Sequence, residues 1–208
     1  MAYLILLRHG MSEYNKKGLW TGWDDPPLAL EGIAETQKAA DTLKDLPINM
    51  GFTSVQKRHK ETLAIVIMHL GKESLHIVEN VALNERNYGI YTKKNKWEIK
   101  KQVGDEVFQK IRRGWDYPIP EGESLKQVYE RVVAYYISTI LPQLLSGKSV
   151  IVSSSGNALR SLVKYLERIS DLDITKLEIA TGEVYVYQLD ENGNIIHKEI
   201  RNPHPNIV

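Results

Sequence analysis

The feature that most constrains the fold is an uninterrupted apolar run at residues 3–7, which ends abruptly at Arg8-His9-Gly10. Its length and continuity predict a strand that is buried on both faces, as in the centre of a parallel sheet. A second strand-like run at 149–153 leads into Ser154-Ser155-Gly156. Because ligands of α/β sheets bind beyond the carboxyl ends of the strands, we expect both polar segments at one binding edge.

Strand-like and helix-like segments alternate along the rest of the chain. Expected strands are 3–7, 50–53, 78–83, 149–153 and, as the last one, 181–189; expected helices are 31–43, 57–70, 124–145 and 157–169, with a charged and mostly helical stretch at 91–117. Ser12 and Ser124 are candidate helix N-caps. This order predicts an α/β fold, a three-layer α/β/α sandwich with a mostly parallel central sheet, in which residues 1–208 form a single domain.

The composition excludes several classes of function. The 27 Lys and Arg residues nearly balance 26 Asp and Glu residues, so no global field attracts nucleic acid or an anionic membrane, and any anion site must be local. The chain has no Cys, which excludes disulfides, thiolate metal sites and a Cys nucleophile. No apolar run is long enough to span a bilayer, and the N-terminal run lacks the marks of a signal peptide. We therefore expect a cytoplasmic location.

The Arg8-His9-Gly10 triplet offers a specific chemistry. A His at the end of a strand can attack phosphorus in line, and an adjacent Arg can neutralise the phosphoryl oxygens. Gly10 would let backbone N–H groups approach the anion without a Cβ in the way. So short a triplet also occurs by chance as the charged end of a strand. Its wider context must decide between the two.

That context is a series of segments in a fixed order. The matching segments are residues 7–15 and 19–23, Leu28, Gly32, Phe52-Thr53-Ser54, Arg58, Thr62, residues 83–89, Asn95-Lys96, Arg112-Arg113, Glu123-Ser124-Leu125, residues 156–160 and Ala180-Thr181-Gly182. Together they resemble the cofactor-dependent phosphoglycerate mutases of the histidine phosphatase superfamily. The resemblance extends from residue 3 to about residue 189, so it implies a phosphoglycerate-mutase-like fold for nearly the whole chain.

The resemblance also implies roles for the matched residues. His9 is expected to be the phosphohistidine nucleophile, flanked by phosphate-binding Arg8 and Arg58, and Glu85 to be the general acid or base. Residues expected to hold phosphate and carboxylate groups are Ser12, Asn15, Thr21, Gly22, Tyr88, Lys96, Arg112, Arg113, Gly156 and Asn157. The implied reaction interconverts 2-phosphoglycerate and 3-phosphoglycerate, small phosphorylated acids, with 2,3-bisphosphoglycerate as primer and no metal. Family members are often dimers, which leaves a homodimer open here.

One residue of the expected site departs from this family. A His that bonds the transferring phosphoryl oxygens is expected before Gly156, but the sequence has Ser155. Losing such a donor typically costs a few kcal/mol, roughly a hundredfold in rate, so we expect impaired mutase activity. His59, Ile90 and Lys93 are also atypical of the family, which indicates a site either naturally diverged or rebuilt by engineering.

Ser155 leaves two alternative functions open. With His9 or His59 as its base, it could be the nucleophile of a serine-hydrolase-like esterase, although Ser-x-Ser-Gly does not match the Gly-x-Ser-x-Gly motif. The chain could instead be a catalytically silent member that binds phosphorylated ligands. Phosphate on His9 would indicate the mutase, a fluorophosphonate adduct on Ser155 the esterase, and ligand binding without either adduct the silent member.

Overall fold

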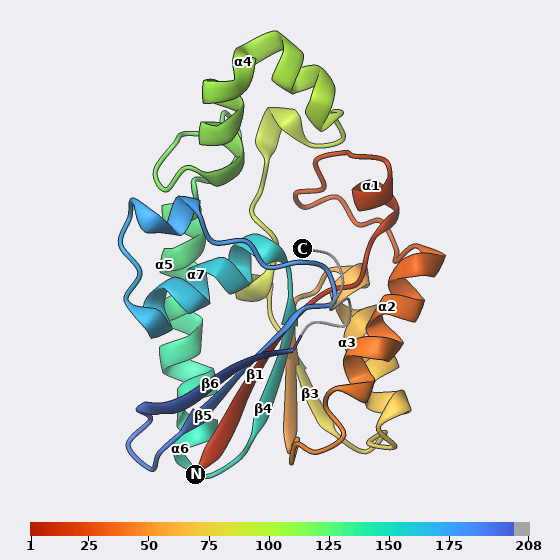
Figure 1. Ribbon diagram of the computed structural model, residues 1–208, viewed down its shortest axis with the longest axis vertical. Helices are drawn as coiled ribbons and strands as arrows, with labels where there is room; N and C mark the ends of the chain where they lie inside the picture. The colour runs from red at the N-terminus through yellow and green to blue at the C-terminus, as the bar shows by residue number, and fades with distance from the viewer. Residues whose placement is uncertain (202–208) are drawn as a thin grey trace.

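A six-stranded sheet forms the centre of the computed structural model, which describes residues 1–201 (Figure 1). Residues 202–208 of the expected domain lie outside the described part. The strands are β1 Ala2–Arg8, β2 Met50–Thr53, β3 His76–Glu79, β4 Val150–Ser154, β5 Val184–Leu189 and β6 Ile195–Arg201, in the spatial order β3-β2-β4-β1-β5-β6. The β1–β4, β4–β2 and β2–β3 pairs are parallel, whereas β5 and β6 add antiparallel neighbours. The mostly parallel sheet is therefore confirmed.

Helices cover both faces of this sheet (Figure 1). The helices of one face are α2 Leu30–Asp41 and α3 Lys57–His69, and those of the other are α5 Leu125–Tyr135, α6 Leu141–Leu145 and α7 Gly156–Glu167. Leu4 and Leu6 pack into the core under α5 and α7, and Ile5 and Leu7 pack under α2 and α3. Successive side chains of a strand point to opposite faces, which explains why β1 is apolar from Ala2 to Leu7. The three-layer sandwich is confirmed.

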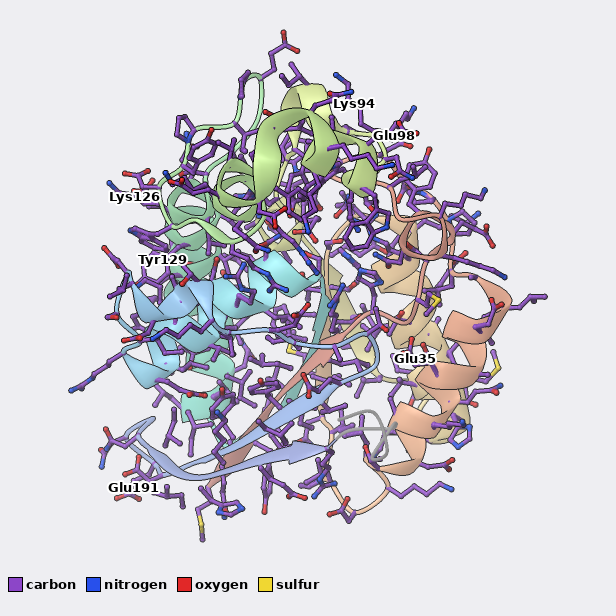
Figure 2. All side chains as sticks on the ribbon, turned by 45° about the horizontal axis from the view of Figure 1, so that its top comes forward. Glu35, Lys94, Glu98, Lys126, Tyr129 and Glu191 are labelled. Atoms are coloured by element: carbon purple, nitrogen blue, oxygen red, sulfur yellow. The ribbon has the colours of Figure 1, made fainter. Side chains whose placement is uncertain are left out.

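A smaller layer lies over the carboxyl ends of the parallel strands. It consists of α1 Glu13–Lys16, α4 Lys96–Arg113 and the loops around them, with α4 at the top of Figure 1. Figure 2 shows Lys94 and Glu98 at this end of the molecule and Glu191, in the β5–β6 turn, at the opposite end. The core of this layer is Trp20, Tyr88, Ile99, Phe108, Ile111 and Ile119. With an apolar core of its own, this layer covers the edge of the sheet where the parallel strands end.

Both predicted caps are confirmed. Ser12 caps α1 and Ser124 caps α5, each as part of a capping box in which the residue three positions later bonds back to the cap. The helix expected at 124–145 begins as predicted but is not continuous. A π-helical segment, Tyr136–Ile140, separates α5 from α6.

Two strand predictions need correction. The strand expected at 78–83 is β3, which already ends at Glu79, because the Asn80 side chain accepts a bond from the Ala82 N–H (2.8 Å) and starts a 3-10 turn over Val81–Leu83. The segment 181–189 is not the last strand. It forms β5, and β6 follows as an edge strand whose side chains are largely exposed, so its sequence lacks the apolar pattern of a buried strand. Within residues 1–201, no helix combines the length and apolar character that crossing a bilayer requires.

Candidate active site

A polar pocket lies between the carboxyl end of β1, the start of α7 and both ends of α4. It encloses about 570 Å³ of empty space, including solvent at its mouth, which suits a small ligand. Its lining residues are Arg8, Asn15, Trp20, Thr21, Glu85, Tyr88, Lys96, Arg112, Arg113, Gly156, Asn157, Arg160, Glu178 and Ile179. Most of the binding residues expected from the sequence are thus brought together around one cavity.

His9 lies beside this pocket, directly after β1. Its backbone N–H donates to the Ser154 carbonyl oxygen (2.9 Å), which ties the ends of β1 and β4 together. Its ring Nδ1 lies 2.6 Å from the Gly10 carbonyl oxygen, and because a carbonyl only accepts, Nδ1 carries the proton. Burial, then the charges of Arg58 and Arg8, lower the pKa of His9 well below 6.5. The ring is therefore neutral, with the Nε2 lone pair available as a nucleophile.

Two arginines flank His9, the half-buried Arg8 and the buried Arg58. Arg8 donates from Nη1 to the Ile179 carbonyl oxygen. Arg58, in the first turn of α3, donates to the carbonyl oxygens of Asp24 (3.2 Å) and Gly22 (3.3 Å). Burial lowers the pKa of Arg58 to about 10, so it stays charged at neutral pH. The Nε atoms of Arg8 and Arg58 are buried without a hydrogen-bond partner, which leaves both guanidinium groups with donors for an anion.

Glu85 is held in place at the pocket wall. Its Oε1 accepts hydrogen bonds from the Arg86 N–H (2.6 Å) and from Asn157 Nδ2 (2.9 Å). Asn157 Nδ2 also contacts the Tyr88 hydroxyl (3.0 Å). Because both bonds to the Glu85 carboxylate fall on Oε1, Oε2 has no protein donor among the bonds of the described residues. That oxygen is the atom able to exchange a proton with a ligand.

Further cations come from the two ends of α4. Burial, then the charges of Arg112 and Arg8, lower the pKa of Lys96 to about 8. Arg112 and Arg113 line the pocket from the end of the same helix. Their side chains contact Glu178, at 3.4 Å from Arg112 Nη2 and 2.5 Å from Arg113 Nη2. A chain that is almost neutral overall therefore concentrates positive charge around one cavity.

Three residues expected to touch a ligand also have structural contacts, and their binding roles stay predictions. Ser12 and Gly22, like His9 and Arg58, are not among the residues that line the pocket. The Ser12 side chain caps α1, and Gly22 has φ +53°, which favours glycine, and presents its carbonyl oxygen to Arg58. Gly10 donates its N–H to Thr62 Oγ1 (3.2 Å) rather than to the pocket. It is glycine because a Cβ there would lie 2.3 Å from the Gly32 carbonyl oxygen.

Ser155 and His59 both lie near His9. Ser155 is the N-cap residue of α7 and directly follows Ser154, the partner of His9. Its Oγ is buried and has no hydrogen-bond partner, so it forms no bond to either His9 or His59. The serine–histidine pair that an esterase requires is not formed. The His59 ring, in contrast, lies against the His9 ring, with centroids 5.0 Å apart.

The other two atypical residues lie outside the pocket. Lys93 adopts φ +68°, a left-handed conformation, and its Nζ lies 3.1 Å from an Asp24 carboxylate oxygen. Ile90 is partly exposed, and its N–H donates to the Pro120 carbonyl oxygen (3.2 Å). Neither residue contributes to the lining.

Sequence reasoning missed several residues that shape the site. Arg160 and Glu178 line the pocket. Arg160 Nη1 donates to Asn157 Oδ1 (2.9 Å) and so orients the amide that holds Glu85. Arg131 donates to the carbonyl oxygens of Glu85 (3.0 Å), Ala82 (2.8 Å) and Asn84 (2.9 Å). Arg160 falls within a matched segment and could have been found there, whereas nothing in the sequence singles out Arg131.

No group of three or more His, Asp or Glu side chains within residues 1–201 is placed to hold a metal ion. The expectation of a reaction without metal stays a prediction.

Comparison with known proteins places these residues in context. The family described as "Histidine phosphatase superfamily (branch 1)" matches residues 4–200. The 2,3-bisphosphoglycerate-dependent phosphoglycerate mutases of Chelativorans sp. and Parvibaculum lavamentivorans are 46% and 43% identical over 199 residues, which is 95% of this chain and 97% and 95% of theirs. Among solved structures, Bacillus stearothermophilus YhfR has a TM-score of 0.82 at 22% identity, covering 94% of both chains. A mycobacterial glucosyl-3-phosphoglycerate phosphatase has a TM-score of 0.78 at 19% identity, covering 97% of this chain and 98% of its own.

Proposed function

Because the chain belongs to the histidine phosphatase superfamily, we propose that it interconverts 2-phosphoglycerate and 3-phosphoglycerate by way of a phosphohistidine at His9. The observation that carries this proposal is the state of the His9 ring. Its Nδ1 proton is bound by the Gly10 carbonyl oxygen, and burial with two neighbouring arginines holds its pKa well below 6.5. A neutral imidazole with a free Nε2 beside a cationic pocket is what attack on phosphorus requires.

The residues around His9 support each part of the reaction. The Nε2 lone pair forms the N–P bond as the P–O bond to the donor breaks, while Arg8 and Arg58 neutralise the phosphoryl oxygens. Glu85 gives a proton from its carboxyl group to the leaving oxygen. In the second half, its carboxylate takes the proton from the accepting hydroxyl, and the N–P bond breaks in turn. Lys96, together with Arg112 and Arg113, would hold the substrate carboxylate and, when the ligand is bisphosphorylated, the phosphate that is not being transferred.

A primer is required to load His9. The relatives are named as dependent on 2,3-bisphosphoglycerate, and the cations around the pocket, with two orphaned Arg Nε donors beside it, fit so anionic a molecule. When bound, this molecule supplies the phosphoryl group. Because position 155 is a serine, it provides no imidazole to the phosphoryl group. The impaired turnover expected from this change stays a prediction.

A labelling experiment tests the proposal. The protein is incubated with ³²P-labelled 2,3-bisphosphoglycerate, and a label that is stable to base but lost in acid is expected on His9. His9→Ala should abolish the label, and Glu85→Gln should bind 3-phosphoglycerate but turn it over slowly. A fluorophosphonate adduct on Ser155 without label on His9 would support the esterase instead. Substrate binding with neither adduct would support the silent binding protein.

A further inference from the structure

His59 lies in the first turn of α3 and contacts the nucleophile. The His59 and His9 rings are 5.0 Å apart between centroids, with their planes inclined by 35°. His59 follows Arg58 directly and, like His9, is almost completely buried. A second imidazole is therefore packed against the first at the point where the phosphoryl group would be carried.

The hydrogen bonds of His59 define its tautomer. Ser54 Oγ accepts the Gln56 N–H (3.0 Å) and lies 2.5 Å from His59 Nδ1. The Ser54 hydroxyl could either donate to Nδ1 or accept from it, but its proton has no other acceptor among the bonds of the described residues. We therefore assign that proton to the bond with Nδ1 and the ring proton of His59 to Nε2. His9 has the opposite arrangement, because its Nδ1–H faces the Gly10 carbonyl oxygen. The two adjacent rings thus present different groups at Nε2, a lone pair on His9 and an N–H on His59.

Several donors next to His9 have no partner. His59 Nε2 and Ser155 Oγ are buried without a hydrogen bond, and so are the Nε atoms of Arg8 and Arg58. Nearly all buried polar groups in proteins are hydrogen-bonded, so such a group of orphaned donors calls for a ligand rich in acceptors. A phosphoryl group, with three outer oxygens, is such a ligand.

We propose that His59 is a further catalytic residue, whose Nε2–H binds the phosphoryl group on His9, with the Ser155 hydroxyl as a second donor. In this arrangement an imidazole from the start of α3 takes over the contact that the family makes from the residue before Gly156. The proposal rests on the proposed function.

Electrostatics determines how far His59 can replace a cationic donor. Burial, then the charge of Arg58 and the proximity of a second titratable ring in His9, lower the pKa of His59 well below 6.5. The ring is accordingly neutral and donates a hydrogen bond without adding a charge. Neutral donors are roughly half as strong as charged ones, so His59 would support phosphoryl transfer without fully restoring it.

Two single variants and one double variant test this role. The rate of His9 phosphorylation by labelled 2,3-bisphosphoglycerate is measured in a single turnover, and KM for 3-phosphoglycerate is measured separately. Loss of one oxyanion-hole donor typically slows catalysis by roughly a hundred- to a thousandfold. Because the neutral His59 ring is a weaker donor than a charged one, His59→Ala should slow phosphorylation by at least about tenfold with KM nearly unchanged. His59→Gln, whose amide N–H lies near the position of Nε2, should retain more activity. Adding Ser155→His to His59→Ala should recover the rate.

Other results would overturn the proposal. Phosphorylation of His59→Ala at the wild-type rate would do so directly. A slow His59→Ala that neither the Gln variant nor the added Ser155→His improves would show that His59 only fills space. Urea unfolding of each variant separates such a packing defect from a lost contact.

Vanadate binding distinguishes this proposal from the proposed function. Vanadate resembles a phosphoryl group in transfer and needs no turnover. If wild type never carries phosphate on His9, the proposed function fails, yet His59→Ala should still bind vanadate at least about tenfold more weakly. Binding should also shift the ¹⁵N resonance of His59 Nε2. Equal vanadate affinity with no shift would refute the role of His59 in either case.

Discussion

Glu178 places a carboxylate inside a pocket built for anions, and its removal should tighten substrate binding. One carboxylate oxygen lies 2.5 Å from Arg113 Nη2 and 3.4 Å from Arg112 Nη2. Burial alone would raise the pKa of Glu178, but the hydrogen bond and charge of Arg113, followed by Arg112 and Arg8, hold it below the usual value. Glu178 is therefore ionised at neutral pH and neutralises cations that the substrate would use.

The exposure of Glu178 limits the size of the effect. Two unit charges about 4 Å apart near a protein surface attract by about 4 kcal/mol at an effective dielectric constant of about 20. The Glu178 side chain is 58% exposed, however, and measured net energies of exposed pairs are about 0.2–1 kcal/mol. The lower range applies to this pair, so Glu178→Gln should lower KM for 3-phosphoglycerate by about 1.4- to fivefold, since about 1.4 kcal/mol corresponds to a tenfold change.

Initial rates at low and high ionic strength provide the assay. At about 1 M salt the screening length falls to about 3 Å, so the gain should largely disappear. Glu106→Gln is the matched control, because it removes the same charge from an exposed carboxylate that pairs with Lys110 (2.7 Å) away from the pocket lining. An unchanged KM for Glu178→Gln at low salt, or an equal gain in the control, would refute the reasoning.

Further measurements test the buried charges. Burial holds the pKa values of His9 and His59 below 6.5, so the unfolded state takes up protons first as the pH falls. The free energy of unfolding should be full above about pH 6.5 and decline below it, by at most about 1.4 kcal/mol per pH unit for each ring. An equal free energy of unfolding in urea at pH 5 and pH 7 would contradict this. Arg131→Met breaks the half-buried ion pair with Glu123 (2.8 Å) and the bond to the Glu85 carbonyl oxygen. It should therefore lower the free energy of unfolding by about 3 kcal/mol and kcat by about tenfold, because the loop that carries Glu85 loses its anchor. A variant with normal kcat would show that this loop keeps its position without Arg131. Crystals grown in phosphate should show an anion between Arg8 and Arg58, and an anion bound elsewhere with this site empty would count against the assignment.

The fold was largely predictable because burial on two faces leaves a clear sequence pattern. Residues 3–7 form the centre of β1, and their alternate side chains enter the two main cores. The edge strand β6 leaves no such pattern, since its residues 196–200 are exposed. The main chain of β6 pairs with β5. Because main-chain pairing requires no particular side chains, it leaves no pattern in the sequence.

The site was predictable where chemistry demands a particular side chain at a strand end. His9 was proposed in this way, whereas Arg58, in the first turn of α3, was proposed only from the resemblance to the family. The roles of both residues stay predictions. Arg131 was missed because a lone arginine on an amphipathic helix is usually a solvated side chain. Its importance depends on a bond to the Glu85 carbonyl oxygen, far away in the sequence. Contacts of this kind exist only once the chain is folded.

The departures at residues 59 and 155 are understood differently once the chain is folded. In sequence they are two unrelated anomalies, one in the first turn of α3 and the other at the N-cap of α7. In the structure, His59 lies against the His9 ring, and Ser155 follows the residue whose carbonyl oxygen accepts the His9 N–H. Position 155, on one side of His9, thus lacks an imidazole, whereas position 59, on α3, supplies one. Phosphoryl transfer depends on where donors lie around the phosphorus and not on which element supplies them. A site can therefore lose a donor at the start of one helix and gain one from the start of another.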